Sequence, residues 1–223
     1  MLRSHFPRAS ILGCSTAGEI FGTTVGDDSL AVTAVRFRHT RVVSRRVTVR
    51  DAADSRDAGG LSGDGPHFER TVVMGDAPAE SHTVAIAGLY GGRLEVGSAS
   101  LGGWDSFGPE RLITRSTANE LYELDGQPAL ELYKRYLGPH SAGLPATGLL
   151  YPLSLRDLAE PVGLVRTILG VNEARGSVTF AGDMPVGTYA GLMRANFDRL
   201  IEGSTVATSR SVAELGPPRR SRC

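Results

Sequence analysis

Alternation of apolar and polar positions predicts strands in the first half of the chain. Val and Thr recur in two neighbouring stretches, residues 30–37 and 41–50, and Arg38-His39-Thr40 would connect them. Turn residues such as Asp76-Ala77-Pro78 and Gly91-Gly92 separate the later stretches. Further strands are predicted for residues 10–12, 68–74, 83–90 and 93–99.

A helical spacing appears after residue 118. Residues 119–124 are predicted to form a strand, with Asp125-Gly126 as a turn. Pro128 suits the first helical position, where its missing N–H costs nothing, and Gly138 suits a left-handed end. Between them the apolar side chains that recur at helical spacing are Ala129, Leu132, Tyr133, Tyr136 and Leu137.

The last third of the chain predicts a hairpin and a second helix. Residues 164–171 and 177–181 flank the turn at residues 172–176. A helix is expected from about Gly191 to Ile201, with Met193, Phe197, Leu200 and Ile201 on one stripe. The pattern indicates a mixed α/β (α+β) fold, with a sheet-rich N-terminal region, covering helices and a smaller C-terminal strand-and-helix region.

Composition narrows the choice of partners. The 24 basic residues of the 223 balance 24 acidic ones, so the net charge does not favour a nucleic acid or an anionic membrane surface. No apolar run reaches the length of a transmembrane helix, and only two cysteines are present. We expect a cytoplasmic protein with no nucleic-acid or membrane partner.

Two glycine-rich loops are candidate parts of a ligand site. In residues 13–19 the hydroxyls of Ser15 and Thr16 could satisfy backbone amides or a ligand, and Glu19 ends the loop. Cys14 would be a nucleophile if a histidine lowered its pKa, and a buried structural cysteine is the alternative. Residues 59–65 contain Gly63 and Asp64 and could form an amide nest for an anion, or a turn that holds nothing.

A third loop, residues 102–110, holds the only tryptophan. Trp104, Phe107 and Tyr122 could wall an apolar pocket. Its polar anchors would be Arg115 for a carboxylate and Asp105 for an amine, together with Asn119. The alternative is that Trp104 plugs the sheet and Arg115 pairs on the surface.

The motifs of common enzymes do not match. Ala17 stands where the Gly-x-Ser-x-Gly nucleophile elbow needs glycine, which disfavours a serine hydrolase. Residues 59–65 lack the Gly-Lys-[Ser/Thr] of a P-loop, and no Pro-Cys-x-x-Cys follows His67 as a zinc deaminase requires. Haem is possible through a histidine, although no Cys-x-x-Cys-His motif is present.

Several segments together resemble the FIST family of sensory domains. In chain order they are residues 11–20, 59–65, 103–109, 119–130, 151–153, 165–169 and 180–185. The resemblance implies residues 1–140 as an internally shortened FIST N-like region and residues 141–215 as a partial FIST C-like region. Residues 216–223 are expected to be a disordered tail.

The resemblance also implies a function. FIST domains are sensory parts of bacterial signal-transduction proteins that bind small ligands such as amino acids, and some members bind haem and sense nitric oxide. We therefore expect a non-enzymatic sensing module that acts through a signalling partner such as a histidine kinase or a cyclic-dinucleotide enzyme. A haem-based nitric oxide sensor and a thiol-dependent enzyme using Cys14 are the alternatives. The chain looks truncated relative to the family pattern.

Overall fold

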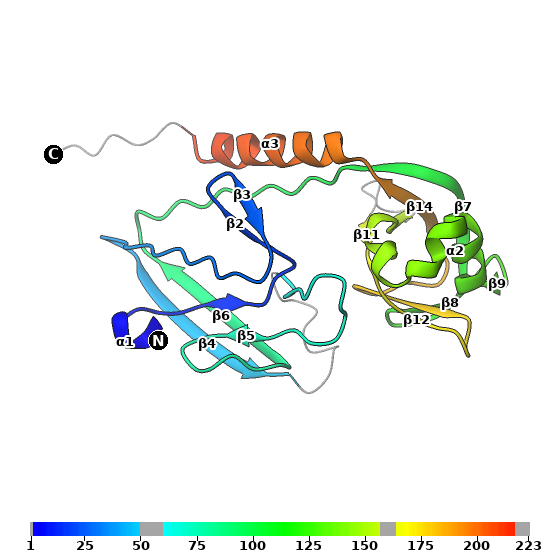
Figure 1. Ribbon diagram of the computed structural model, residues 1–223. Coiled ribbons are helices and arrows are strands. Elements are labelled where there is room, and N and C mark those ends of the chain that lie inside the picture. Colours follow the sequence, from blue (N-terminus) through cyan, green and yellow to red (C-terminus); the bar gives the residue numbers. More distant parts are fainter. Residues whose placement is uncertain (1, 50–59, 157–163, 217–223) are drawn as a thin grey trace. The chain divides into compact units, whose positions relative to one another are not determined.

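The computed structural model describes residues 2–49, 60–156 and 164–216 (Figure 1). The chain divides into two compact units, Met1–Glu95 and Val96–Cys223. Each unit contains strands and at least one helix, which confirms the mixed α and β fold class. The expected disordered tail lies outside the described residues beyond Gly216.

The first unit is built from short antiparallel pairs. The two long strands β4 (Arg41–Thr48) and β6 (Thr83–Tyr90) pair over their whole length, which confirms both predictions. Their alternating Val, Thr and Ala side chains suit a two-stranded ribbon. The remaining elements are α1 (Leu2–His5), the pair β1 (Gly13–Cys14) and β5 (Val73–Met74), and the pair β2 (Glu19–Phe21) and β3 (Thr24–Gly26).

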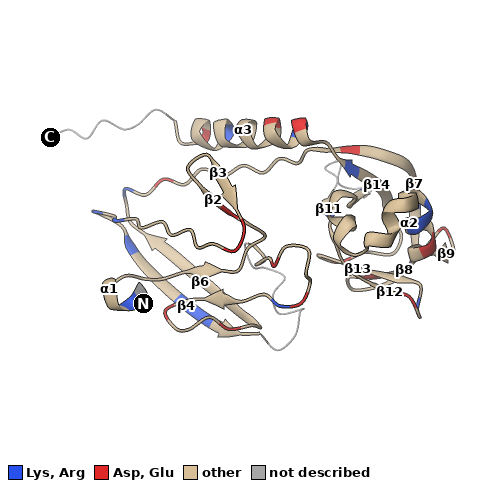
Figure 2. Cartoon of the chain, viewed as in Figure 1, with Lys and Arg blue, Asp and Glu red and all other residues tan. Residues whose placement is uncertain are grey.

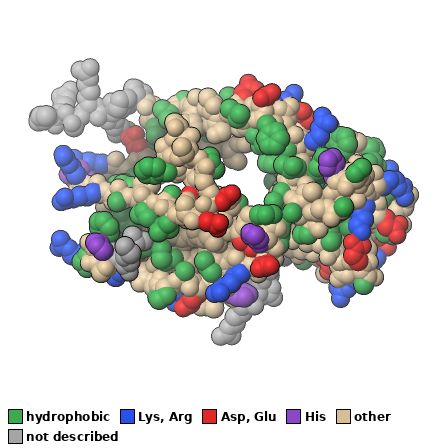
Figure 3. Space-filling view, in the orientation of Figure 1, with side chains coloured by type: hydrophobic (Ala, Val, Ile, Leu, Met, Phe, Trp, Pro, Cys, Tyr) green, Lys and Arg blue, Asp and Glu red, His purple; other side chains and the backbone are tan. Residues whose placement is uncertain are grey.

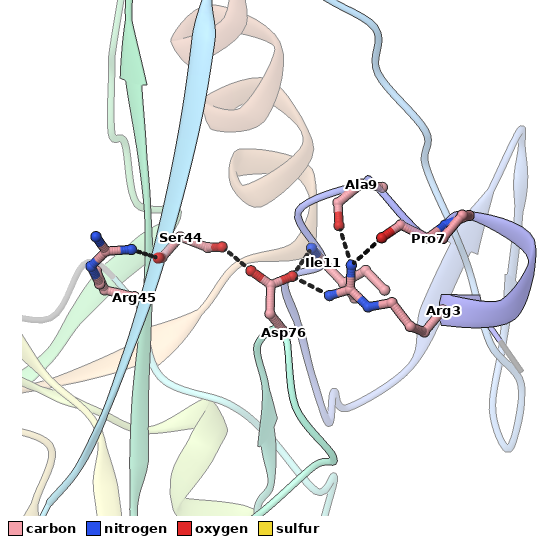
Figure 4. A network of polar contacts seen from close by, with 7 residues as sticks. All are labelled: Arg3, Pro7, Ala9, Ile11, Ser44, Arg45 and Asp76. Atoms are coloured by element: carbon pink, nitrogen blue, oxygen red, sulfur yellow. Dashed lines mark hydrogen bonds and ion pairs between the residues drawn. The ribbon is translucent and has the colours of Figure 1, made fainter.

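The carboxylate of Asp76 joins three segments of this unit (Figure 4). Its Oδ1 accepts from the backbone N–H of Ile11 at 2.9 Å and from Arg3 at 2.5 Å, and its Oδ2 accepts from the hydroxyl of Ser44 on β4. These donors lower the pKa of Asp76, with Ser44 the largest cause and Ile11 and Arg3 following. An ionised carboxylate therefore holds the N-terminal segment against the β4–β6 ribbon.

Four predicted strands are wrong in extent. Residues 10–12, 30–37 and 93–99 form no strand, and of residues 68–74 only β5 is a strand. Val32 and Val35 are 50% and 66% exposed. Alternation predicts an extended chain, but a strand also needs a hydrogen-bonded neighbour, and residues 30–37 have none in a described sheet. Large apolar side chains consequently remain on the surface, as the green atoms in Figure 3 show.

The second unit is organised by one curled antiparallel sheet of eight strands. Their order is β11-β10-β14-β7-β8-β13-β12, and β9 pairs with β8. The strands are β7 (Trp104–Thr117), β8 (Glu120–Leu124), β9 (Gln127–Pro128), β10 (Leu153–Arg156), β11 (Leu164–Arg166), β12 (Ile168–Asn172), β13 (Ser177–Phe180) and β14 (Tyr189–Ala195).

Strand β7 belongs to both halves of this sheet. Its first part, from Trp104 to Leu112, pairs with β14, and its last part, from Ile113 to Thr117, pairs with β8. Irregular register on both sides bends the strand, as bulges do. The curl of the sheet follows from this change of partner.

The prediction of a loop at residues 102–110 is therefore wrong from Trp104 onward. Glycine and proline in this stretch suggested a loop, yet Gly108 has φ of +97° inside the strand. Register with β14 moves from Ser106 to Glu110, so residues 107–109 form a bulge opposite Leu192. The missing N–H of Pro109 interrupts no regular pairing there.

Helix α2 (Ala129–Leu137) covers β8, β9 and β13 and closes the core. Pro128 is its N-cap residue, so the helix begins one residue later than predicted. Gly138 has the positive φ of 56° expected at the helix end, and Asp125 and Gly126 both have positive φ in the predicted turn. The core it covers includes Ile113, Leu121, Leu130, Leu132, Ile168, Val178, Phe180 and Met184, each at most 2% exposed.

The second predicted helix begins later and runs further than expected. Residues 189–195 form β14 between β10 and β7, because Ala190, Gly191 and Leu192 are buried in a central strand. Asn196 caps α3 (Phe197–Glu214) by accepting from the N–H of Arg199 at 3.2 Å. The expected apolar stripe does not form a buried face, since Phe197 and Ile201 are each 68% exposed.

The hairpin predicted for residues 164–171 and 177–181 is confirmed from residue 168 onward. β12 and β13 pair from Ile168↔Phe180 to Asn172↔Ser177, and the turn between them ends in Gly176 with φ of 62°. The 3-10 helices η2 (Gly138–Gly143) and η3 (Ala146–Leu150) connect α2 to β10. Within the described residues, no helix combines the length and apolarity that spanning a membrane requires.

Candidate functional site

The two glycine-rich loops of the first unit lie against each other. The N–H of Gly63 donates to the carbonyl of Ser15 at 3.0 Å, and a Cβ on Gly63 would lie 3.2 Å from the backbone of Ala17. Ser15 in turn accepts from the N–H of Val72 through its hydroxyl at 3.0 Å. Residues 13–19 and 60–65 therefore pack against each other.

The polar side chains of the first loop bind one another. Thr16 donates its hydroxyl proton to Glu19 Oε1 at 2.6 Å, and Ser29 donates its hydroxyl and N–H to Oε2. These hydrogen bonds, from Thr16 first and Ser29 next, lower the pKa of Glu19. Glu19 thus acts as an internal brace between the loop and Ser29. The thiol of Cys14 is free and Cys14 is exposed, so the alternative of a buried structural cysteine is wrong.

Asp64 of the second loop binds backbone amides that lie further along the chain. Its Oδ2 accepts from the N–H groups of Arg70 at 2.9 Å and Glu69 at 2.8 Å, and these bonds lower its pKa, that of Arg70 most. Phe68 adopts a positive φ of 55°, which lets the chain turn around the carboxylate. These amides belong to residues 69 and 70, outside the loop 59–65 that was expected to form the nest, and they bind a carboxylate of the chain itself.

Trp104 and Asp105 lie at the start of β7, beside the first turn of α3. Asp105 pairs with Arg199 at 2.6 Å and accepts from the Asn196 side chain at 2.9 Å. The indole Nε1 of Trp104 is buried and has no hydrogen-bond partner among the described residues. Asp105 therefore serves as an anchor for α3, and its oxygens are engaged by protein groups.

A surface hollow lies at the other end of β7. Its volume is about 490 Å³, and it is lined by Arg115 and Thr117 of β7, Tyr122 of β8 and Arg175 of the β12–β13 turn. The Cζ atom of Arg115 lies 4.7 Å from the centroid of the Tyr122 ring. Its Nε donates to Glu123 Oε1 at 2.9 Å. Stacking and the hydrogen bond hold this guanidinium in place while it lines the hollow.

A second carboxylate, that of Glu120, organises the rim of the hollow. It accepts from the Ser177 hydroxyl at 2.5 Å and the Tyr122 hydroxyl at 2.7 Å, and Arg175 Nη1 lies 3.5 Å from its Oε2. The same three groups lower its pKa in that order of importance. Glu120 is consequently an anion at neutral pH, and two Arg–Glu pairs border the hollow.

Of the residues expected around the tryptophan pocket, the structure brings Arg115 and Tyr122 together. Asn119 instead supports the β7–β8 turn, since its Nδ2 donates to the carbonyl of Phe180 at 2.9 Å. Phe107 contacts Tyr151, with ring centroids 6.2 Å apart. Trp104 is thirteen positions before the end of the strand that reaches the hollow and is not among the residues that line it.

Sequence reasoning missed Thr117, Glu120 and Arg175. Thr117 and Glu120 flank the β7–β8 turn, and Arg175 precedes Gly176 in a turn that was predicted. The sequence offered only polar side chains at two separate turns, β7–β8 and β12–β13. These turns lie side by side because β8 pairs with β13. Charges of both signs occur in each unit (Figure 2). The two arginines of the hollow are therefore a local feature and not part of a larger basic surface.

The chain belongs to the FIST family. A model of the FIST N domain matches residues 1–59 and 52–127, and a model of the FIST C domain matches residues 129–219. FIST domains are sensory domains of signal transduction that bind small ligands, and they are not catalytic. No curated protein and no solved structure shows significant similarity to the chain.

Proposed function

We propose that this chain is a cytoplasmic, non-enzymatic module that senses an amino acid or another small carboxylate in the hollow between Arg115 and Arg175. The observation that carries the proposal is the presence of two guanidinium groups at one solvent-open hollow. Guanidinium binds a carboxylate through two parallel hydrogen bonds, and Thr117 adds a hydroxyl to the lining.

The neighbouring carboxylates suit the amine of an amino acid. Asp105, the amine anchor first expected, is bound to Arg199 and Asn196 at the start of β7. Glu120 and Glu123 instead contact the two arginines of the hollow. With both charges present, an amino acid placed here leaves neither its ammonium nor its carboxylate without a partner.

The signal is passed to a partner protein. FIST domains work within signalling proteins, and the family pattern favours a histidine kinase or a cyclic-dinucleotide enzyme as that partner. In this proposal the sensing module binds the ligand, and the partner catalyses the signalling reaction.

A thermal-shift screen tests the proposal. The twenty common L-amino acids, acetate and succinate are added to the full chain, with sodium chloride at matched ionic strength. At least one carboxylate should raise the Tm of the wild type and of Arg135→Gln, which removes an exposed charge on α2, but not that of Arg115→Gln. A folded wild type whose Tm responds to no carboxylate contradicts the proposal.

A further inference from the structure

The two arginines of the hollow are held unequally. Arg115 makes a 2.9 Å hydrogen bond to Glu123 and stacks on Tyr122. Arg175 meets Glu120 in an ion pair at 3.5 Å, and both side chains of that pair reach solvent. Exposed ion pairs at such distances contribute little free energy, so the Arg175–Glu120 contact is the easier one to exchange.

Glu120, by contrast, is fixed. The hydroxyl of Ser177, which is fully buried, donates to its Oε1 at 2.5 Å, and the hydroxyl of Tyr122 donates to its Oε2 at 2.7 Å. Both donors stand on strands of the same sheet. When a competing anion arrives, Glu120 therefore stays on these hydroxyls, and the guanidinium of Arg175 is the group that moves.

The turn that carries Arg175 is bonded to helix α2. The carbonyl of Gly176 accepts from the N–H of Leu130 in the first turn of α2 at 3.0 Å. Glu173, in the same turn, pairs with Lys134 of α2 at 2.6 Å. A displacement of Arg175 therefore acts on a segment with two direct contacts to α2.

We propose that the Glu120–Arg175 pair is a ligand-operated latch, in which Glu120 occupies Arg175 in the free protein and the ligand carboxylate takes its place. This inference rests on the proposed function. It adds that the carboxylate of Glu120 competes with the ligand and that the effect of binding is passed from the turn to α2. Binding releases Arg175 from Glu120, the turn at residues 172–176 shifts, and α2 receives the change through Gly176 and Glu173. The affinity for a carboxylate is set partly by the internal carboxylate that it displaces.

The test uses acetate as the bare carboxylate probe. The full ¹⁵N-labelled chain is titrated with sodium acetate, against sodium chloride at equal ionic strength, and the amide signals of Gly176 and Leu130 are followed. Glu120→Gln removes the competing charge and keeps a hydrogen-bonding group. Its acetate Kd should fall by up to about fivefold, the value of a weak exposed ion pair. Without acetate, its Gly176 signal should lie closer to that of acetate-saturated wild type.

Two further variants complete the test. Glu131→Gln makes the same change in net charge on the exposed face of α2 and should alter neither Kd nor the Gly176 signal. Arg175→Gln also opens the latch, so its free-state signals should move as in Glu120→Gln, while its acetate Kd rises. This variant keeps the inference testable if Glu120→Gln does not fold.

The outcomes separate the two proposals. Wild-type binding that depends on Arg115, with an unchanged Kd in Glu120→Gln and unmoved turn signals in both latch variants, overturns the latch and leaves the proposed function standing. If acetate and the amino acids fail to bind the folded wild type, the proposed function fails and the latch fails with it.

Discussion

The guanidinium of Arg115 lies over the ring of Tyr122, with 4.7 Å between Cζ and the ring centroid. The two residues come from neighbouring strands, β7 and β8, and both line the hollow. The ring contacts the guanidinium while Glu123 accepts a hydrogen bond from its Nε. Arg115 has a long side chain with many accessible rotamers. These contacts hold it in position for a ligand before binding, which reduces the entropy lost when the ligand binds.

Loss of the Tyr122 ring should weaken carboxylate binding. Tyr122→Leu removes the platform under Arg115, and an exposed cation–π contact is worth about 0.5–1 kcal/mol, or about two- to fivefold in Kd. Tyr122→Phe keeps the ring and loses only the hydrogen bond to Glu120, so it should retain more affinity. Acetate titrations of both variants measure the difference. Equal Kd values for Tyr122→Leu and wild type would rule out the platform role.

Truncating Asn196 should destabilise helix α3. Its side chain accepts from the N–H of Arg199 and donates to Asp105, so Asn196→Ala removes a cap and an anchor together. Loss of an N-cap costs about 0.5–2 kcal/mol. Urea denaturation followed by circular dichroism measures the loss. Ser209→Ala, in the exposed middle of α3, is the control and should cost little, because alanine favours helix.

The Asp76 network should make the first unit sensitive to acid. Its donors stabilise the ionised carboxylate, so the folded pKa lies below the ordinary value of about 3.9. This stabilisation is present in full above the unfolded pKa and is lost as pH falls through the folded pKa. Asp76→Asn should therefore lower stability at pH 7 and differ less from wild type near pH 3.

Urea denaturation at the two pH values measures this dependence. Both partners of the Arg3–Asp76 pair are 43% exposed, so the effect at pH 7 should stay at about 1 kcal/mol or less. Glu69→Gln, which removes an exposed carboxylate of the same unit, is the matched control for loss of charge. If the free energies of unfolding of Asp76→Asn and wild type differ as much at pH 3 as at pH 7, the ionised form of Asp76 is not the cause.

The core under α2 should tolerate truncation poorly. Phe180 is fully buried on β13, and Phe180→Ala should cost about 3–5 kcal/mol because it leaves a cavity among packed side chains. Leu169 lies on the neighbouring strand and is 40% exposed, so Leu169→Ala should cost about 1 kcal/mol or less. Denaturation midpoints of the two variants provide the comparison. Similar losses would place Phe180 outside the core.

A side chain at Gly103 should disturb the packing of α3. A Cβ there would lie 2.3 Å from the backbone nitrogen of Leu200, which is closer than atoms approach without movement. Gly103→Ala should destabilise the unit by about 1–3 kcal/mol. It should also speed hydrogen exchange of the α3 amides. Gly170→Ala, where a Cβ meets nothing within 4 Å, is the control and should leave that exchange unchanged.

Elements with strong local signals could be predicted from the sequence alone. β4 and β6 follow from alternation, and α2 follows from Pro128, the helical spacing and Gly138. The Asp125-Gly126 turn follows from two residues that tolerate positive φ. For α2 and the turn, neighbours along the chain supply most of the free energy that selects the conformation. The strands β4 and β6 also need each other as hydrogen-bonded partners.

The remaining features depended on tertiary contacts. Residues 30–37 alternate as a strand does and have no partner in a described sheet, whereas β14 carries a helix-like spacing and is a central strand because β10 and β7 flank it. Pro109 is accommodated in β7 only because the register with β14 shifts around it.

The sequence by itself determined the mixed α and β class, helix α2, the hairpin at residues 168–180 and the FIST resemblance, since each depends on local pattern or on the order of motifs. The tertiary structure alone decided which polar residues meet. Arg115 and Arg175 are far apart in the chain and line one hollow because β8 pairs with both β7 and β13. Strand register over such separations has no local signal, so the hollow could not be predicted from spacing.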